Sequence, residues 1–222
     1  MVDQYRGLYE AAETDLRRAL EIQPQNGDVW RRLGLAYQNN NRFRDAIPAY
    51  EKAIQFQPGY FKNYQALCDV LSAQGNYEEA VRQCTEMIAL APDLWESYFA
   101  RATVYFNWGR FADADADSRL ALKLDPSASK AIQLLASSLV IQSRYEEAIP
   151  LFQRAIEIGP ETDRIYLNLG QTLRWAGLPQ QARQAYRKGL ALAQAELANN
   201  SREVIIQAHS AYLRARRNPG RI

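Results

Sequence analysis

A period of 34 residues runs through this chain and constrains its fold more than any other feature. Prolines and alanines recur at that interval: Pro24, Pro58, Pro92, Pro126, Pro160 and Ala12, Ala46, Ala80, Ala114, Ala148, Ala182. A repeat of this length is one supersecondary unit, which buries its apolar face only by stacking on its neighbours. Because about 190 of the 222 residues follow the period, we expect an array of repeats.

Within one period, the apolar residues have helical spacing. Trp30, Leu33 and Tyr37 fall on one face of a first helix, and Ala46 and Tyr50 fall on one face of a second helix. The periodic prolines end the second helices, because proline lacks an N–H group and pushes its predecessor out of the helical region. Each repeat is therefore predicted to be a pair of antiparallel helices.

These residues resemble the tetratricopeptide-repeat (TPR) family. The family pattern W-x2-L-G-x2-Y…A-x3-F…P is nearly complete in one repeat, at Trp30, Leu33, Gly34, Tyr37, Ala46, Tyr50 and Pro58. The resemblance implies an all-α fold, a right-handed superhelical solenoid of helix-turn-helix repeats with a C-terminal capping helix. We expect a half repeat that supplies only a second helix, five full repeats, and a capping helix with a basic tail: 1–26, 27–60, 61–94, 95–128, 129–162, 163–196 and 197–222.

The two ends depart from the pattern. The first helix of the leading repeat is missing, which favours a segment taken from a longer protein. Residues 201–217 carry an apolar stripe and are expected to form a helix that covers the last open face of the array. The basic tail that follows is expected to be solvated: Arg214, Arg216, Arg217 and Arg221.

The charge and hydropathy of the sequence bear on the partners and the location of the protein. The net charge of +2 is too small for general attraction to nucleic acid or to anionic lipid, so neither is expected as a partner. No stretch approaches 18 apolar residues, and a cytoplasmic location is expected. Arg outnumbers Lys by 22 to 5, which weakly favours a bacterial source.

The sequence offers little material for catalysis. It contains no phosphate-binding glycine loop, no dinucleotide fingerprint, no H-E-x-x-H and no G-x-S-x-G. His209 is the only histidine. Cys68 and Cys84 fall on positions that face the core, where we expect reduced, inert thiols; the alternative is a nonessential disulfide. We therefore expect neither an enzyme nor a bound cofactor or metal.

One charged residue stands at a core position. Arg101 replaces the leucine that other repeats carry there, and a buried arginine needs an anionic partner. In a common TPR variant, an arginine at this position pairs with an acid sixteen residues later. The resemblance thus implies an Arg101–Asp117 ion pair.

By resemblance to the family, ligands lie in a concave groove lined by the first helices, as extended peptides or partner helices. The expected groove residues are Arg31, Lys62, Gln65, Asp69, Phe99, Thr103, Phe106, Asn107, Lys130, Gln133, Arg164, Asn168, Gln171, Arg174 and Trp175, with Ser137, Val140 and Ile141 beside them. Exposed aromatic residues beside amides and arginines are typical of an interface. The alternative for Phe99 and Phe106 is contact with neighbouring helices.

The leading functional interpretation is a non-catalytic scaffold or adaptor that binds a protein or peptide. The carboxylate clamp of chaperone-binding TPR adaptors and the asparagine ladder of sugar-transferring TPR enzymes are both missing from the groove positions. The alternative is a regulatory TPR domain of a larger signalling enzyme or transcription regulator. Self-association through the exposed half repeat at 1–26 is a further expectation.

Overall fold

The computed structural model describes residues 2–199 and 212–213, and it describes side chains for residues 10–198 and 212–213. Every element within residues 2–199 is an α-helix. The helices are α1 (Val2–Ile22), α2 (Gly27–Asn39), α3 (Phe43–Phe56), α4 (Phe61–Ala73), α5 (Tyr77–Leu90), α6 (Trp95–Asn107), α7 (Phe111–Leu124), α8 (Ser129–Ile141), α9 (Tyr145–Ile158), α10 (Asp163–Trp175) and α11 (Pro179–Asn199).

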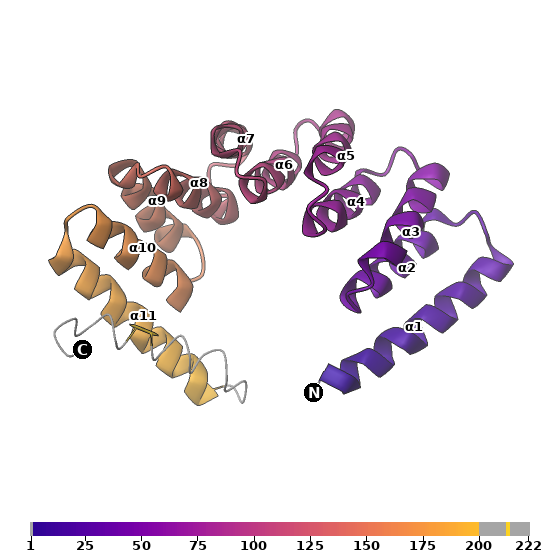
Figure 1. Ribbon diagram of the computed structural model, residues 1–222, viewed down its shortest axis with the longest axis horizontal. Coiled ribbons are helices and arrows are strands. Elements are labelled where there is room, and N and C mark those ends of the chain that lie inside the picture. The colour runs from indigo at the N-terminus through magenta and orange to yellow at the C-terminus, as the bar shows by residue number, and fades with distance from the viewer. Residues whose placement is uncertain (1, 200–211, 214–222) are drawn as a thin grey trace. The chain divides into compact units, whose positions relative to one another are not determined.

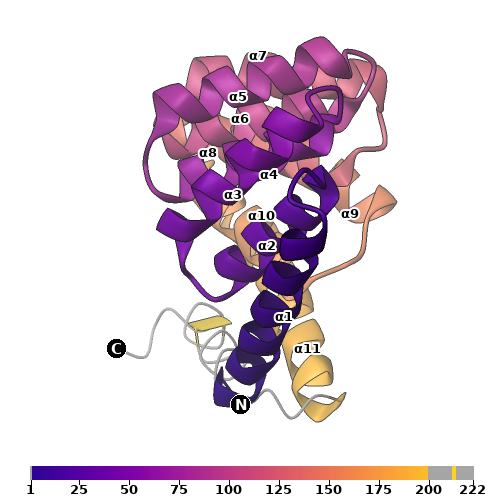
Figure 2. The ribbon, with the colours of Figure 1, turned by 90° about the vertical axis from the view of Figure 1, so that its right-hand side faces the viewer.

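The chain forms two compact units. The N-terminal unit, Met1–Asp125, holds α1 to α7, and the C-terminal unit, Pro126–Ile222, holds α8 to α11. In the N-terminal unit, α2, α4 and α6 each pack on the helix that follows them, and α5 and α7 lie in a layer above α4 and α6 (Figure 1, Figure 2). In the C-terminal unit, α8 packs on α9 and α10 packs on α11.

Each first helix ends in the same turn. The second residue after the helix has a positive φ at every repeat of the period: Asn41, Gly75, Gly109, Ser143 and Gly177. Glycine adopts this left-handed conformation without steric cost, and asparagine tolerates it better than most residues. The turn reverses the chain and allows the second helix to run back along the first.

Small residues allow the two helices of each hairpin to approach closely. The periodic alanines of the second helices are fully or almost fully buried: Ala46, Ala80, Ala114, Ala148 and Ala182. At Gly34, a Cβ atom would lie 2.5 Å from the Tyr50 ring, so only glycine fits beneath that ring. The small–large pairing inside the hairpin therefore sets the spacing of its helices.

Polar contacts fix α1 to the first full hairpin. The Arg42 guanidinium bridges Glu13 of α1 and Asp45 of α3, both at 2.7 Å, and it lies 4.6 Å from the centre of the Tyr37 ring. Arg17 of α1 donates a hydrogen bond to the Tyr37 hydroxyl at 2.9 Å. These contacts join α1 to its neighbours along one edge.

The predicted ion pair is present. Arg101 Nε donates to Asp117 Oδ2 at 2.7 Å, and Arg101 Nη2 donates to Asp117 Oδ1 at 2.9 Å. The Asp117 side chain is 5% exposed and the Arg101 side chain is 20% exposed. Arg101 Nη1 also donates to Thr85 Oγ1 of α5 at 3.2 Å, so the pair connects α6 and α7 to the preceding hairpin.

The expectation of reduced thiols at Cys68 and Cys84 is wrong. The two residues form a disulfide between α4 and α5, and both are 0% exposed. Their Cα atoms lie 5.6 Å apart, within the range that a disulfide spans. The bridge occupies the positions at which Gly34 meets Tyr50 one repeat earlier, so the closest approach within the hairpin brings the two thiols together.

The expected capping helix and basic tail fall almost entirely outside the described residues, as does His209. Tyr212 and Leu213 are the exceptions. Leu213 is buried, and its Cδ1 atom lies 3.7 Å from the place where a Cβ of Gly189 would stand on α11. An apolar residue thus covers part of α11, as expected for this segment.

We expect Asp117→Ala to lower the free energy of unfolding by about 3 kcal/mol, because it leaves the Arg101 guanidinium half-buried without its anion. Adding Arg101→Leu should restore most of the loss. The double variant reproduces the Leu33 and Ala49 pair that the first full hairpin uses at the same positions. Urea denaturation of both variants and the wild type measures the difference; equal midpoints for Asp117→Ala and wild type would contradict the role of the pair.

We also expect no titratable thiol in protein unfolded without reductant, and two per chain after reduction. Reduction should lower the free energy of unfolding by about 3 kcal/mol, since the bridge closes a loop of 16 residues. The control is Cys68→Ala/Cys84→Ser, which copies the Ala102 and Ser118 pair of the next hairpin and should be insensitive to reductant. Two reactive thiols before reduction would refute the bridge.

Candidate functional site

The predicted groove residues lie on the first helices. We call the sides of α2, α4 and α6 in the N-terminal unit, and of α8 and α10 in the C-terminal unit, the first-helix face. Each unit has its own stretch of this face, and the two stretches differ in charge and in how many polar groups already have partners.

In the N-terminal unit, several predicted residues are engaged within the chain. Arg31 donates to Asp28 at 2.6 Å, and its guanidinium lies 5.8 Å from the centre of the Tyr60 ring. Asn107 donates to Ser72 Oγ at 3.4 Å, which joins α6 to α4. Both side chains therefore already make polar contacts within the N-terminal unit.

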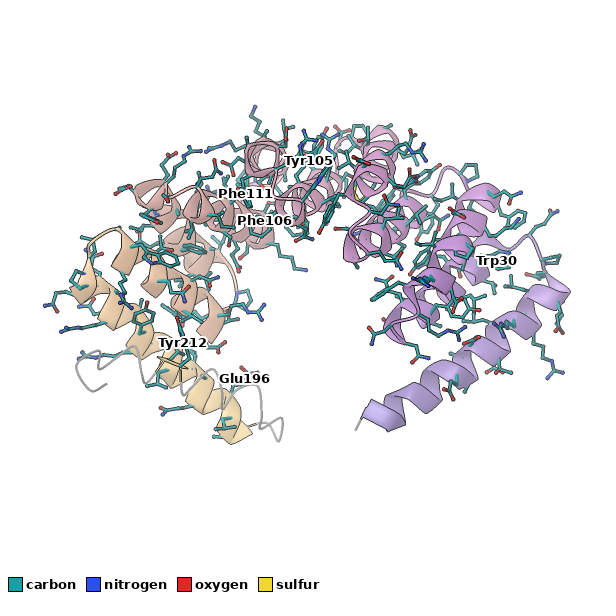
Figure 3. All side chains as sticks on the ribbon, viewed as in Figure 1. Trp30, Tyr105, Phe106, Phe111, Glu196 and Tyr212 are labelled. Carbon is teal, nitrogen blue, oxygen red and sulfur yellow. A yellow bond between two sulfur atoms is a disulfide. The ribbon has the colours of Figure 1, made fainter. Side chains whose placement is uncertain are left out.

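Phe99 and Phe106 of α6 are partly covered by other aromatic rings, which agrees in part with the alternative that they contact neighbouring helices. Phe106 lies against Phe111 of α7, with ring centres 5.7 Å apart and the rings nearly perpendicular (Figure 3). Phe99 lies 5.7 Å from the Trp95 ring on the same helix. The Thr103 hydroxyl donates to the Phe99 carbonyl at 2.8 Å. Phe99 and Phe106 remain half-buried, so contact with neighbouring rings does not cover them fully.

A charged cluster joins three helices of the N-terminal unit. The Tyr50 hydroxyl passes Gly34, reaches the first-helix face and donates to Gln38 Oε1 at 2.7 Å. Burial raises the pKa of the Tyr50 hydroxyl, the negative charge of Asp69 raises it further, and the positive charge of Arg31 opposes both effects. The Asp69 side chain reaches solvent, but surrounding protein atoms raise the pKa of its carboxyl to about 6.

Lys62 and Gln65 complete the predicted set in this unit. Lys62 is exposed and Gln65 is half-buried, both on α4. The N-terminal stretch of the face therefore combines cations with the carboxylates of Asp69 and Glu96, and its charges are mixed.

The C-terminal stretch has an open pocket. It measures about 170 Å³ and lies between α8 and α10. The predicted residues that line it are Ser137, Val140, Ile141, Asn168, Gln171 and Trp175. Ile141 is 52% exposed and Trp175 is 55% exposed, which leaves two large apolar side chains in contact with solvent at its mouth.

Two further lining residues, Phe152 and Thr172, were not predicted. Phe152 belongs to the second helix α9 and occupies the position of Tyr50 three repeats earlier. The 34-residue period could have predicted Phe152, because residues at the Tyr50 position point through the hairpin toward the first helix. Among the residues at this position, only the aromatic ones are long enough to reach the first-helix face.

The two helices that form this pocket carry three cations. Lys130 and Arg164 lie in the first turns of α8 and α10, and Arg174 precedes Trp175; all three are exposed. None of them has an ion-pair partner among the residues that the structure describes. Gln133 donates to Ser129 Oγ at 3.1 Å on the same helix.

Tyr212 reaches this face. Gln171 Nε2 donates to the Tyr212 hydroxyl at 2.8 Å, and Tyr212 lies beside α11 (Figure 3). Burial raises the pKa of Tyr186 to about 12, with a smaller contribution from Tyr212 and an opposing one from Arg174. One of the two predicted amides at the pocket is thus already used within the chain.

Larger clefts occur on the side of the second helices. One of about 490 Å³ is lined by Trp30, Tyr37 and Lys52, among others, and a second of about 490 Å³ repeats it four periods later with Tyr166 and Lys188. Some of their polar groups have partners within the chain: the Trp30 indole donates to the Pro24 carbonyl, and the Lys188 ammonium lies 5.6 Å from the centre of the Tyr166 ring.

The described residues were compared with the arrangements typical of a metal centre and of a membrane span. Among the described side chains, no group of three or more His, Cys, Asp or Glu could hold a metal ion. None of the helices in residues 2–199 is both long enough and apolar enough to cross a bilayer.

The Asp69 carboxyl generates a pH prediction. Its pKa is raised in the folded protein, so the stability that it confers is complete below about pH 4 and is lost as the pH rises through about 6. Asp69→Asn should therefore melt at a higher temperature than wild type near pH 7.5, and the difference should vanish near pH 4. Asp93→Asn, an exposed acid in a loop, is the control. A pH-independent difference would contradict the assignment.

Comparison with known proteins agrees with this architecture. Profiles of the tetratricopeptide repeat match residues 5–26, 27–60, 96–127 and 126–195. The human protein O-mannosyl-transferase TMTC1 is 26% identical over 194 residues, which covers 85% of this chain and 22% of that protein. The chain spans 22% to 35% of the length of the first curated relatives that it matches.

Solved structures share the fold. PilF of Pseudomonas aeruginosa superposes with a TM-score of 0.71 at 20% identity, covering 96% of this chain and 91% of that one. YrrB, described as a TPR protein with an unusual peptide-binding site, superposes with a TM-score of 0.60 at 15% identity, covering 89% and 97%. With the helix pairs, the period and the matched profiles in agreement, the chain belongs to the tetratricopeptide-repeat family.

Proposed function

We propose that this protein is a non-catalytic interaction module whose first-helix face binds an extended peptide or a partner helix. One observation carries the proposal: α8 and α10 leave Ile141 and Trp175 more than half exposed around an open pocket, beside cations that have no ion-pair partner in the described part of the chain. Apolar side chains that remain exposed next to unpaired charge are a mark of an interaction site.

The family supports the general function. TPR proteins bind other proteins or peptides, and YrrB is described as having a peptide-binding site. At 15% identity, the likeness to YrrB shows the fold and does not transfer its ligand. The surface of this chain must therefore be assigned from its own residues.

The absence of catalysis is part of the proposal. TMTC1 is described as a transferase, but this chain corresponds to 22% of its length. The sequence contains none of the nucleophile, base or phosphate-binding motifs sought above, and the first-helix face presents amides, apolar side chains and charges of both signs. We propose that these groups recognise a ligand without activating it.

The disulfide bears on the compartment. The sequence alone favours the cytoplasm, where thiols are kept reduced. The buried Cys68–Cys84 bridge instead favours an environment in which disulfides persist, and we propose that the protein works there.

A regulatory TPR domain of a larger enzyme or transcription regulator is the second candidate. The observation that favours it is the length ratio, since the chain corresponds to between 22% and 35% of its first curated relatives. In that case the same face would bind a peptide, and the effect would be felt in another domain. Self-association through residues 1–26 stays a proposal of its own.

The test is selection of short peptides from a displayed random library on the purified chain, followed by hydrogen exchange of the complex. We expect binders to protect α8 and α10. Arg164→Glu/Arg174→Glu should weaken binding by at least about tenfold, because the reversed charges lie on α10.

The matched control is Arg183→Glu/Arg187→Glu, which makes the same change of charge at exposed residues of α11. It should bind as the wild type does. Protection confined to α9 and α11, or equal weakening in both variants, would assign binding to another surface and overturn the proposal. A library that yields no binder would overturn it as well.

A further inference from the structure

We propose that the pocket between α8 and α10 takes one large apolar side chain of a peptide whose neighbouring residues are acidic. This inference rests on the proposed function and specifies the ligand class of the same face. It is argued from the residue at the base of the pocket, from the volume of the pocket, from the polar groups at its edge, and from the charged residues on α8 and α10.

The floor of the pocket is apolar because of one residue. Phe152 is 1% exposed and occupies the position from which Tyr50 sends its hydroxyl to Gln38 in the first full hairpin. Phenylalanine brings a ring without a hydroxyl to the same place. This hairpin therefore presents an apolar surface to the pocket where others present a hydrogen-bonding group.

The volume suits a single side chain. A cavity of about 150 Å³ lined by apolar residues holds a molecule the size of benzene. The pocket measures about 170 Å³, which is enough for the side chain of a phenylalanine, leucine or methionine. Ile141 and Trp175 would lose their contact with water around such an anchor, and buried aromatic contacts of this kind dominate binding.

The rim offers one unengaged amide. Asn168 is half-buried at the pocket, and its side chain has no hydrogen-bond partner among residues 10–198 and 212–213. A primary amide donates and accepts, so it can pair with both groups of a peptide backbone. The other polar groups are occupied: Ser137 donates to the Gln133 carbonyl at 2.8 Å, and Gln171 donates to Tyr212.

Charge decides the flanking residues of the ligand. The sequence of α8 contains no acidic residue, and that of α10 contains only Asp163, whose carboxylate accepts a hydrogen bond from the Arg164 backbone at 2.7 Å. Lys130, Arg164 and Arg174 outnumber this single carboxylate, so the two helices together carry a net positive charge. A peptide with carboxylates complements it, and a basic peptide is repelled.

Arg164 lies four residues before Asn168 on α10, so its Cα atom is about 6 Å nearer the N-terminal end of the helix. Arg174 is adjacent to Trp175 at the other end of the helix. Carboxylates on both sides of the anchor would therefore meet a cation. The N-terminal stretch of the face lacks this pattern, since Asp69 and Glu96 would repel such a ligand.

The first part of the test reads the sequences of the peptides selected above. We expect enrichment of a Phe, Leu, Met or Trp with Asp or Glu within about four residues. Peptides that protect α8 and α10 but are neutral or basic would overturn this inference and leave the proposed function intact. If no peptide binds, or if protection falls on α9 and α11, the proposed function fails and this inference fails with it.

The second part uses the leading peptide in synthetic form, with Trp175 fluorescence and titration calorimetry as readouts. Replacing its apolar anchor by alanine should raise Kd at least about tenfold. Replacing its acids by the matching amides should raise Kd by about tenfold at low salt, and this difference should shrink in about 0.5 M NaCl. Binding that is indifferent to the anchor would reflect charge attraction alone and would overturn the proposal.

The third part changes the protein. Ile141→Ser should remove most of the preference for the anchor, whereas Ile158→Ser, an exposed isoleucine of α9, should not. Arg164→Glu/Arg174→Glu should remove the preference for acids, whereas Arg183→Glu/Arg187→Glu should keep it. Circular dichroism and thermal melts verify that each variant is folded. Equal effects of the pocket variants and their controls would overturn the assignment of the pocket.

Discussion

The structure depends on how closely the two helices of each hairpin approach at one pair of positions. A small residue of the first helix faces one residue of the second helix there. The pairs are Gly34 and Tyr50, Cys68 and Cys84, Ala102 and Ser118, Ala136 and Phe152, and Gly170 and Tyr186. Where the partner is tyrosine, even one added carbon would lie 2.5 Å from the ring. A larger side chain on both sides would separate the helices and expose the alanines that line the rest of the contact.

The same pair decides what each hairpin presents to the first-helix face. Tyr50 crosses the hairpin and gives the face a hydroxyl, Phe152 gives it an apolar floor, and Cys68 and Cys84 close on each other as a disulfide. The scaffold is thus repeated while its surface varies. A pocket arises between α8 and α10 because the crossing residue there is aromatic and lacks a polar end.

The charged residues of the chain differ in whether the fold pairs them. The Arg101–Asp117 pair is almost enclosed and holds hairpins together, while Arg31 is used by Asp28 of its own helix. Lys130, Arg164 and Arg174 have no ion-pair partner within the described residues. Charges that a fold does not use are available to a ligand, and three of them lie on the two helices that form the apolar pocket. The proposed ligand class follows from that coincidence.

The sequence by itself determined the helical repeat and the helix pairs, because a fixed period assigns every residue to a face. The identity of Asp117 as the partner of Arg101 came from the resemblance to a TPR variant. The sequence also placed Ile141, Asn168 and Trp175 on one surface. Only the tertiary structure decided that Cys68 and Cys84 form a disulfide, that the Phe106 ring packs against the Phe111 ring, and that Phe152 and Thr172 help to line a pocket. A period fixes the direction in which a side chain leaves its helix. It does not fix the rotamer or the distance to the neighbouring helix, and both depend on the side chains of two helices at once.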